Sequence, residues 1–197
     1  MKLSNITGHV ILIMGPTGSG KGSLIQHVKE KFLNLRFLVS CTTRDPRPGE
    51  ENGVQYYYIS QEEFDKKIKQ DEFLEWAEFS GNRYGTLKSE ILEPLRTKEV
   101  VLNEIELQGV QSLIEIIPKE HRTIVYIEAG DWETLKIRAL ARAPISDDHL
   151  QLRHQRYLEE VKSKPHADIV IDNFDGMLDD AKTKLEKIVR DIFEKVK

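Results

Sequence analysis

The chain is poor in cysteine, in long apolar runs and in surplus positive charge, and each shortage excludes a class of protein. Its 197 residues include one cysteine, Cys41, so we expect no intramolecular disulfide and no cysteine-based zinc site. The apolar run Val10–Met14 is shorter than the roughly 20 residues of a membrane span and shorter than the core of a signal peptide. The 29 basic and 33 acidic side chains give a net charge of −4, whereas nucleic acids and membrane surfaces attract an excess of lysine and arginine. We therefore expect a cytoplasmic protein without nucleic-acid or membrane partners.

Apolar strands alternate with amphipathic helices along the chain, which predicts an α/β fold in one domain. Val10–Met14 is a continuous, β-branched run typical of a strand buried on both faces. The apolar residues of Gly20–Phe32 recur at helical spacing directly afterwards. Further strands are expected at Val100–Ile105, Thr123–Ile127 and Ile169–Ile171, and further helices at Gln61–Lys69, at about Leu107–Ile116 and from Leu178 onward. This order predicts a mainly parallel β-sheet flanked by helices.

A glycine-rich loop joins the first strand to the first helix. The run Gly15-Pro16-Thr17-Gly18-Ser19-Gly20-Lys21 fits G-x-x-x-x-G-K in the context that a P-loop requires. Its glycines let backbone N–H groups turn toward phosphate oxygens, and Lys21 is expected to reach the β- and γ-phosphates. Gly22 stands where the usual motif has serine or threonine, and the hydroxyl comes one residue later, at Ser23. The sequence therefore predicts a nucleotide site that comprises Gly15, Pro16, Thr17, Gly18, Ser19, Gly20, Lys21, Gly22 and Ser23.

Gly22 lacks the hydroxyl that usually contacts Mg²⁺ at this position of the motif, so other residues are expected to hold the metal. Glu104 and Glu106 lie at the end of the strand Val100–Ile105, at the edge of a parallel sheet where ligands bind. We expect Mg²⁺, bound with the nucleotide, to be held by phosphate oxygens, Ser23 and Glu104, directly or through water.

A second group of polar residues lies in the stretch from about 40 to 98, which interrupts the alternation with short aromatic strands. Arg44 and Arg47 lie three residues apart in a loop stiffened by proline and glycine, and guanidinium groups suit phosphate oxygens. Glu75 follows within an aromatic segment. A carboxylate can accept hydrogen bonds from both N1–H and the 2-amino group of guanine, and adenine offers no such pair of donors.

In their order and spacing these motifs resemble the guanylate kinase family, over nearly the whole chain. The likeness rests on the P-loop, on Ser-x-Thr-Thr-Arg-x-x-Arg-x-Gly-Glu-x-x-Gly from Ser40, on Glu-Phe-x-Glu-Trp-Ala-x-Phe-x-Gly-x-x-Tyr-Gly-Thr from Glu72, and on Gln108-Gly109. The resemblance implies a P-loop NTPase core with a small GMP-binding lobe and a mobile lid. It also implies Mg²⁺-dependent transfer of the ATP γ-phosphate to GMP. The expected single domain 1–197 divides into a core of about 1–39, 99–136 and 155–197, a GMP-binding lobe of about 40–98 and a lid of about 137–154.

The resemblance also assigns roles to residues. It implies that the GMP phosphate is held by Ser40, Arg44, Arg47, Tyr56 and Tyr84, and that the guanine is read by Glu75 and Thr86, with Glu106 near the base. It implies that the catalytic cations are Lys21, Arg44, Arg138, Arg142 and Arg153. Arg142 and Asn173 are expected on the ATP side.

The sequence departs from the family pattern at two places. Glu104 and Glu106 stand where the family has aspartate, and Ala141, Ala143 and Pro144 replace or follow the glycines of the lid. Alanine and proline restrict the backbone, so we expect a stiffer lid.

Two other readings stay open on the sequence alone. The first is a guanylate-kinase-like module that binds peptides, and the second is a related kinase with another acceptor, such as a sugar phosphate. Retention of Lys21 counts against the first, and the set of Arg44, Arg47, Tyr56 and Glu75 counts against the second. The sequence leaves open the choice between monomer and homo-oligomer, and whether dGMP is an acceptor.

Overall fold

The computed structural model describes residues 5–79, 81–105, 107–142 and 145–197. The expectations for Glu106, Ala143 and Pro144 lie outside these residues, as does the expectation for the side chain of Arg142. Within them, no helix is both long and apolar enough to cross a membrane.

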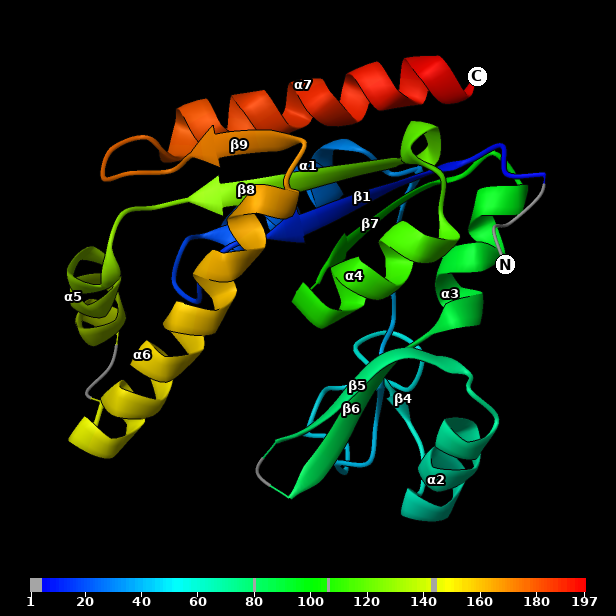
Figure 1. The fold of residues 1–197 in the computed structure, drawn as a ribbon, viewed down its shortest axis with the longest axis horizontal. Coiled ribbons are helices and arrows are strands. Elements are labelled where there is room, and N and C mark those ends of the chain that lie inside the picture. The colour runs from blue at the N-terminus through cyan, green and yellow to red at the C-terminus, as the bar shows by residue number, and fades with distance from the viewer. Residues whose placement is uncertain (1–4, 80, 106, 143–144) are drawn as a thin grey trace.

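A parallel five-stranded sheet forms the centre of the molecule, in the order β2-β7-β1-β8-β9 (Figure 1). All six residues of β1 are buried, as a central strand covered on both faces requires. The strands predicted at Val10–Met14, Val100–Ile105, Thr123–Ile127 and Ile169–Ile171 are confirmed, each within one residue at its ends. The bounds are β1 His9–Met14, β2 Leu35–Phe37, β7 Val100–Glu104, β8 Arg122–Glu128 and β9 Ile169–Asp172.

Alternate residues of β1 face two separate layers of the core, because successive strand side chains point to opposite faces. Ile11 and Ile13 pack with residues of α1 (Lys21–Lys31) and α7 (Leu178–Val196). Val10 and Leu12 pack with α4 (Leu107–Ile116) and with the segment of α3 (Lys88–Leu92) and η1 (Pro94–Arg96). Figure 1 shows α7 along one face of the sheet and α3 and α4 on the other. The predicted α/β fold with a parallel sheet flanked by helices is confirmed.

A second sheet of four strands, in the order β4-β3-β6-β5, lies beside α3 and α4 (Figure 1). Its small core consists of Cys41, Phe64 and Phe73, and α2 packs against it through Phe64. Its strands are β3 Cys41–Thr42, β4 Tyr57–Tyr58, β5 Phe73–Phe79 and β6 Asn82–Leu87, with α2 at Gln61–Lys69. The small sheet thus extends from Cys41 to Leu87. The segment that follows it, α3 and η1, packs on the main core instead.

The carboxyl ends of the main strands have the small sheet on one side and two further helices, with a short helical turn, on the other (Figure 1). These elements are α5 (Trp132–Arg142), α6 (Asp147–Glu160) and η3 (Val161–His166). The short helix η2 (Lys119–His121) lies elsewhere, directly before β8. Trp132 of α5 stacks on His154 of α6 with ring centroids 4.7 Å apart, which fixes the two helices to each other. The carboxyl ends of β1 and β7 therefore face a space bounded by α6 and the small sheet.

Candidate functional site

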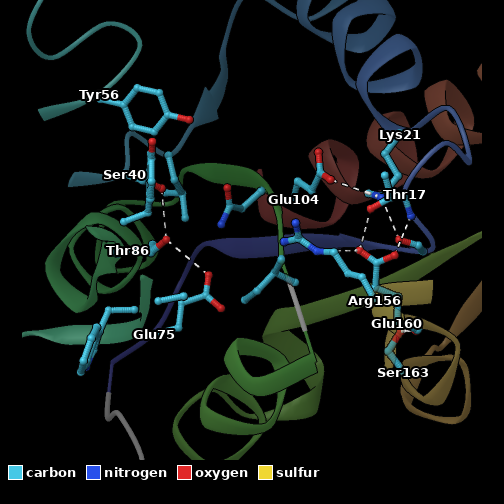
Figure 2. A pocket seen from close by; sticks show the side chains of 18 of the residues that line it. Thr17, Lys21, Ser40, Tyr56, Glu75, Thr86, Glu104, Arg156, Glu160 and Ser163 are labelled. Carbon is cyan, nitrogen blue, oxygen red and sulfur yellow. Dashed lines mark hydrogen bonds and ion pairs between the residues drawn. The ribbon is translucent and has the colours of Figure 1, made fainter. Parts of the chain in front are cut away.

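A cleft of about 700 Å³ joins the P-loop to the small sheet, and Figure 2 shows its side chains. It is lined by the P-loop and the end of β7, by strands β5 and β6, by the segments near Ser40 and Tyr56, and by the last turns of α6 with η3. A second cavity of about 560 Å³, here called the P-loop pocket, is lined by the loop itself and by Glu104. From the predicted sites, the cleft includes Gly15, Thr17, Lys21, Ser40, Tyr56, Glu75, Tyr84, Thr86 and Glu104. The P-loop pocket includes Thr17, Gly18, Gly20, Lys21, Gly22, Ser23 and Glu104.

The P-loop has the backbone that its glycines predict. Gly18 and Gly20 adopt positive φ angles of 90° and 92°, which residues with a side chain rarely adopt. Gly20 also has no room for a Cβ atom, because the side-chain amide of Asn173 lies against it. Asn173 is buried and its Nδ2 donates to the carbonyl oxygen of Ser19 at 2.7 Å. Asn173, expected on the ATP side, therefore stabilises the P-loop through the backbone of Ser19, and it lines neither cavity.

Lys21 is held at the junction of the two cavities. Its ammonium group donates to the carbonyl oxygens of Gly15 at 2.7 Å and Pro16 at 3.1 Å. It also lies 3.3 Å from Oε1 of Glu104, at the end of β7. The lysine is buried, whereas the Glu104 side chain is about half exposed. The positive charge is thus fixed where the P-loop opens into the cleft.

The residues expected to hold Mg²⁺ fit that ion when it arrives with a nucleotide. Glu104 and Ser23 line the same P-loop pocket and offer a carboxylate and a hydroxyl, the oxygen ligands that Mg²⁺ prefers. Among the described residues, no group of three or more histidine, cysteine, aspartate or glutamate side chains could hold a metal by itself. A magnesium ion here would take its other ligands from nucleotide phosphates and water, as is usual for Mg²⁺.

Glu75 and Thr86 face the cleft from neighbouring strands of the small sheet. The two residues are paired in the β5–β6 register, and the Thr86 hydroxyl donates to Oε1 of Glu75 at 3.5 Å. The Ser40 hydroxyl lies 3.2 Å from that of Thr86. Figure 2 shows the three side chains pointing toward one another at the end of the cleft farthest from Lys21. Ser40, expected at the GMP phosphate, is thereby grouped with the residues expected to read the base.

Gly109 of α4 makes room for this carboxylate. A Cβ atom there would lie 2.7 Å from both Cδ of Glu75 and Cγ1 of Ile105, distances that real Cβ atoms do not show. The helix thus approaches Glu75 closely because position 109 carries no side chain.

Arg44 lies behind the cleft and is bound to Glu50. Its Nη2 donates to both carboxylate oxygens of Glu50 at 3.1 and 2.9 Å. Its guanidinium carbon also lies 5.8 Å from the ring centre of Tyr56, which lines the cleft. The backbone N–H of Arg47, the Tyr58 hydroxyl and Arg44 all donate to Glu50 and lower the pKa of that carboxyl to about 2. Arg44 is therefore fixed next to the cleft, while the Arg47 side chain is exposed.

Arg138 and Arg153, two of the expected lid arginines, lie away from the cleft. Nε and Nη2 of Arg138 donate to Oδ1 of Asp175 at 2.9 and 2.7 Å, and Nη2 also donates to the carbonyl oxygen of Asn173. Arg153 is exposed on α6. Neither residue is among those that line the cleft or the P-loop pocket.

Sequence reasoning missed two residues of α6 that do line the cleft, Arg156 and Glu160. Oε2 of Glu160 accepts a hydrogen bond from the backbone N–H of Thr17 at 2.7 Å, and Oε1 accepts one from the Thr17 hydroxyl at 2.9 Å. Nε of Arg156 lies 3.5 Å from the same Oε1. The helical spacing of positions 153, 156 and 160 was a signal that could have found them, since such positions share one face of a helix.

A P-loop on a parallel sheet, facing polar residues of an inserted small sheet across one cleft, defines a P-loop kinase that acts on a second phosphorylated substrate. Residues 7–192 match the family model described as guanylate kinase. The chain is 35% identical over 197 residues to a guanylate kinase of Malacoplasma penetrans (strain HF-2), covering 100% of this chain and 98% of that one. It is 39% identical over 168 residues to one of Rubrobacter xylanophilus, covering 85% and 87%. A crystal structure of guanylate kinase from Anaplasma phagocytophilum superposes with a TM-score of 0.67 at 25% identity, covering 99% and 89%.

The chain belongs to the guanylate kinase family. Members of this family are nucleoside monophosphate kinases, which transfer phosphate from ATP to GMP.

Proposed function

We propose that this chain catalyses transfer of the γ-phosphate of ATP to GMP in the cleft, with ATP at the P-loop and GMP at the small sheet. The observation that carries the proposal is the single cleft that contains both Lys21 and the Glu75–Thr86 pair. One acceptor molecule can span it, with its base at Glu75 and its phosphate directed toward the P-loop.

On the donor side, backbone N–H groups from Thr17 to Gly22 bind the phosphates of ATP. Lys21 places its charge at the β- and γ-phosphates, because it already lies between the P-loop carbonyls and Glu104. Phosphoryl transfer needs such positioning and charge stabilisation more than covalent catalysis.

On the acceptor side, Glu75 accepts hydrogen bonds from N1–H and the 2-amino group of guanine, with Thr86 and Ser40 beside it. Tyr56 and Tyr84 make an edge-to-face pair with ring centres 5.8 Å apart and line the same cleft. They bind the GMP phosphate together with Arg44 and Arg47, after these arginines turn toward the cleft. Glu106 is proposed near the base on the family resemblance alone.

Mg²⁺ bound with ATP would be held by Ser23 and Glu104 together with phosphate oxygens and water, and would neutralise charge on the donor phosphates. Residues 40–98 serve as the GMP-binding lobe and residues 137–154 as the lid, on the core formed by the rest of the chain. Arg138, Arg142 and Arg153 of the lid segment reach the phosphates when the lid closes, which excludes water and prevents hydrolysis of ATP. Asn173 supports the ATP site through the carbonyl of Ser19. Because its substrates are nucleotides of the cytoplasmic pool, we place the reaction in the cytoplasm.

A coupled assay of ADP release tests the proposal, with ATP and Mg²⁺ and with GMP, IMP or AMP as acceptor. We expect strong release with GMP, weaker release with IMP, which lacks the 2-amino group, and little with AMP. Glu75→Gln is expected to reduce the preference for GMP over IMP, because the amide offers one acceptor where the carboxylate offers two. Lack of GMP-dependent release by the unaltered chain would refute the proposed activity. An unchanged preference in the variant would remove Glu75 from the base site.

A further inference from the structure

Arg156 of α6 is a cation at the centre of the cleft that the family motifs do not include. It lines the cleft together with Lys21, Glu104 and Glu75. Figure 2 shows its side chain extending from α6 into the space between Lys21 and Glu104 on one side and Glu75 and Thr86 on the other. If ATP occupies the first side and GMP the second, their phosphates meet near this guanidinium group.

Glu160 fixes this arginine relative to the P-loop. Its carboxylate binds the backbone N–H and the hydroxyl of Thr17 at 2.7 and 2.9 Å, so the end of α6 is tied to the P-loop. Oε1 of the same carboxylate lies 3.5 Å from Nε of Arg156, one helical turn back. Nε is the nitrogen nearest the aliphatic stem, so this contact orients the guanidinium group from its base. An oriented guanidinium group loses less side-chain entropy when a phosphate binds.

Among the described residues, the other cations expected to contact the transferred group lie at the edges of the cleft or outside it, and Arg153 is exposed on α6. Lys21 is held by the carbonyls of its own loop, Arg44 by Glu50 behind Tyr56, and Arg138 by Asp175. Two phosphorylated substrates in one cleft repel each other, and charge on the γ-phosphoryl oxygens must be stabilised as the group moves. Among the residues that the structure describes, Arg156 is the arginine that lines the cleft between the two proposed binding sites.

We propose that Arg156 is a catalytic residue that contacts the γ-phosphoryl group during its transfer, and that Glu160 is a positioning residue acting through it. The inference rests on the proposed function. In the step, a GMP phosphate oxygen forms a bond to the γ-phosphorus, and the bond from that phosphorus to the β,γ-bridging oxygen breaks. ADP leaves with the electron pair of the broken bond. Arg156 keeps its proton throughout and contributes charge and hydrogen bonds.

Steady-state kinetics of Arg156→Gln and Arg156→Lys test the catalytic role. Arg156→Gln is expected to lower kcat about 10- to 100-fold while KM for ATP and for GMP each change less than about threefold. Arg156→Lys keeps the charge without the planar fork and should lose less than about tenfold. The matched control is Lys162→Gln, which removes one exposed cation just beyond the same helix, where Lys162 pairs with Glu159 at 2.7 Å. The control should stay within twofold of the unaltered chain.

Binding of a bisubstrate analogue, adenosine and guanosine joined through five phosphates, gives a readout that does not depend on turnover. Arg156→Gln should weaken binding of this analogue at least tenfold, and of ATP or GMP alone less than threefold, because the arginine contacts phosphate where the two meet. A merely structural arginine would instead change the melting temperature or weaken both single substrates.

A double-mutant comparison separates positioning by Glu160 from its contact with Thr17. Glu160→Gln should lower kcat about tenfold in the unaltered chain and less than twofold in the Arg156→Gln background. Equal factors in both backgrounds would overturn the positioning role. Unchanged kcat and analogue binding in Arg156→Gln, in an enzyme whose unaltered form releases ADP with GMP, would overturn the catalytic role. Absence of that release in the unaltered chain would instead overturn the proposed function.

Discussion

Replacing Gly109 by alanine is expected to damage recognition of guanine without touching the P-loop. The new Cβ atom would lie 2.7 Å from Cδ of Glu75 and 2.7 Å from Cγ1 of Ile105. Ordinary contact begins at 3.4 Å, so Cδ must move by about 0.7 Å, and Oε2, which lies closer still to the new Cβ atom, must move farther. Ile105 is buried and has little freedom to move, so Glu75 takes up most of the displacement.

A displacement of this size matters because the two hydrogen bonds to guanine depend on the position of both carboxylate oxygens. Misplacement by about 1 Å can cost a hundredfold in rate. We expect kcat/KM for GMP to fall about 10- to 100-fold, which corresponds to about 1.4–2.7 kcal/mol. For IMP, which offers one of the two donors, the loss should be smaller, so the preference for GMP over IMP should narrow. KM for ATP should change less than twofold.

The measurement is the coupled assay with GMP and IMP, together with thermal unfolding of each variant. Gln111→Ala is the matched control, because position 111 lies on the exposed face of the same helix. Alanine favours a helix over glycine by up to about 1 kcal/mol, which opposes the strain of the clash, so stability must be measured separately from activity. An unchanged kcat/KM for GMP in a Gly109→Ala variant with normal unfolding would refute the reasoning, since Glu75 would then tolerate the shift.

Metal dependence, acid stability and thiol reactivity provide three independent tests. Among the described residues nothing lies within 4 Å of a Cβ atom built at Gly22, so a serine side chain fits there. Gly22→Ser should add a hydroxyl beside Ser23 and lower the Mg²⁺ concentration for half-maximal activity about three- to tenfold. An Mg²⁺ titration identical to that of the unaltered chain would contradict this. Burial, with the charges of neighbouring His121 and Lys195, lowers the pKa of His9 from 6.5 to about 4. Between these values the unfolded chain binds a proton that the folded chain does not, so the free energy of unfolding should fall by up to about 3 kcal/mol as the pH drops from 6.5 to 4, and urea unfolding of His9→Gln should show a flatter profile. Burial raises the pKa of the Cys41 thiol to about 11, so iodoacetamide at pH 8 should alkylate the folded protein at least about 100-fold more slowly than the unfolded chain, and equal rates would disprove this.

The sequence predicted the main sheet and its helices well because their signals are local. A strand buried on both faces must be apolar throughout, and Val10–Met14 is. The helices at Gln61–Lys69 and Leu107–Ile116 have the predicted bounds, since their apolar spacing and flanking residues are contained in a single stretch. The P-loop was equally readable, because its glycines are required by the backbone of the loop itself.

The partners of the charged side chains could not be predicted, because they come from distant parts of the chain. Thr17 meets Glu160 from 143 positions away, and Asn173 meets Ser19 from 154 positions away. Residue type shows that an amide can donate, but only the folded arrangement shows that Asn173 donates to the loop. Arg138 illustrates the same point, since its carboxylate partner follows β9.

Three cations around the cleft are each held by a carboxylate, and this arrangement bears on how phosphates bind. The pairs are Lys21 with Glu104, Arg44 with Glu50, and Arg156 with Glu160. A carboxylate that holds a cation in place reduces the side-chain entropy lost when a phosphate arrives, which favours a correctly oriented complex. The same carboxylate competes with the phosphate for the cation, so the net binding free energy of the phosphate is reduced. Such competition limits the affinity for substrates and products in the ground state. Contacts that form only in the transition state, as the γ-phosphoryl group moves, still lower the activation barrier of the transfer. An enzyme that must release two nucleotide products in every cycle benefits from that division, because tightly bound products would limit its turnover.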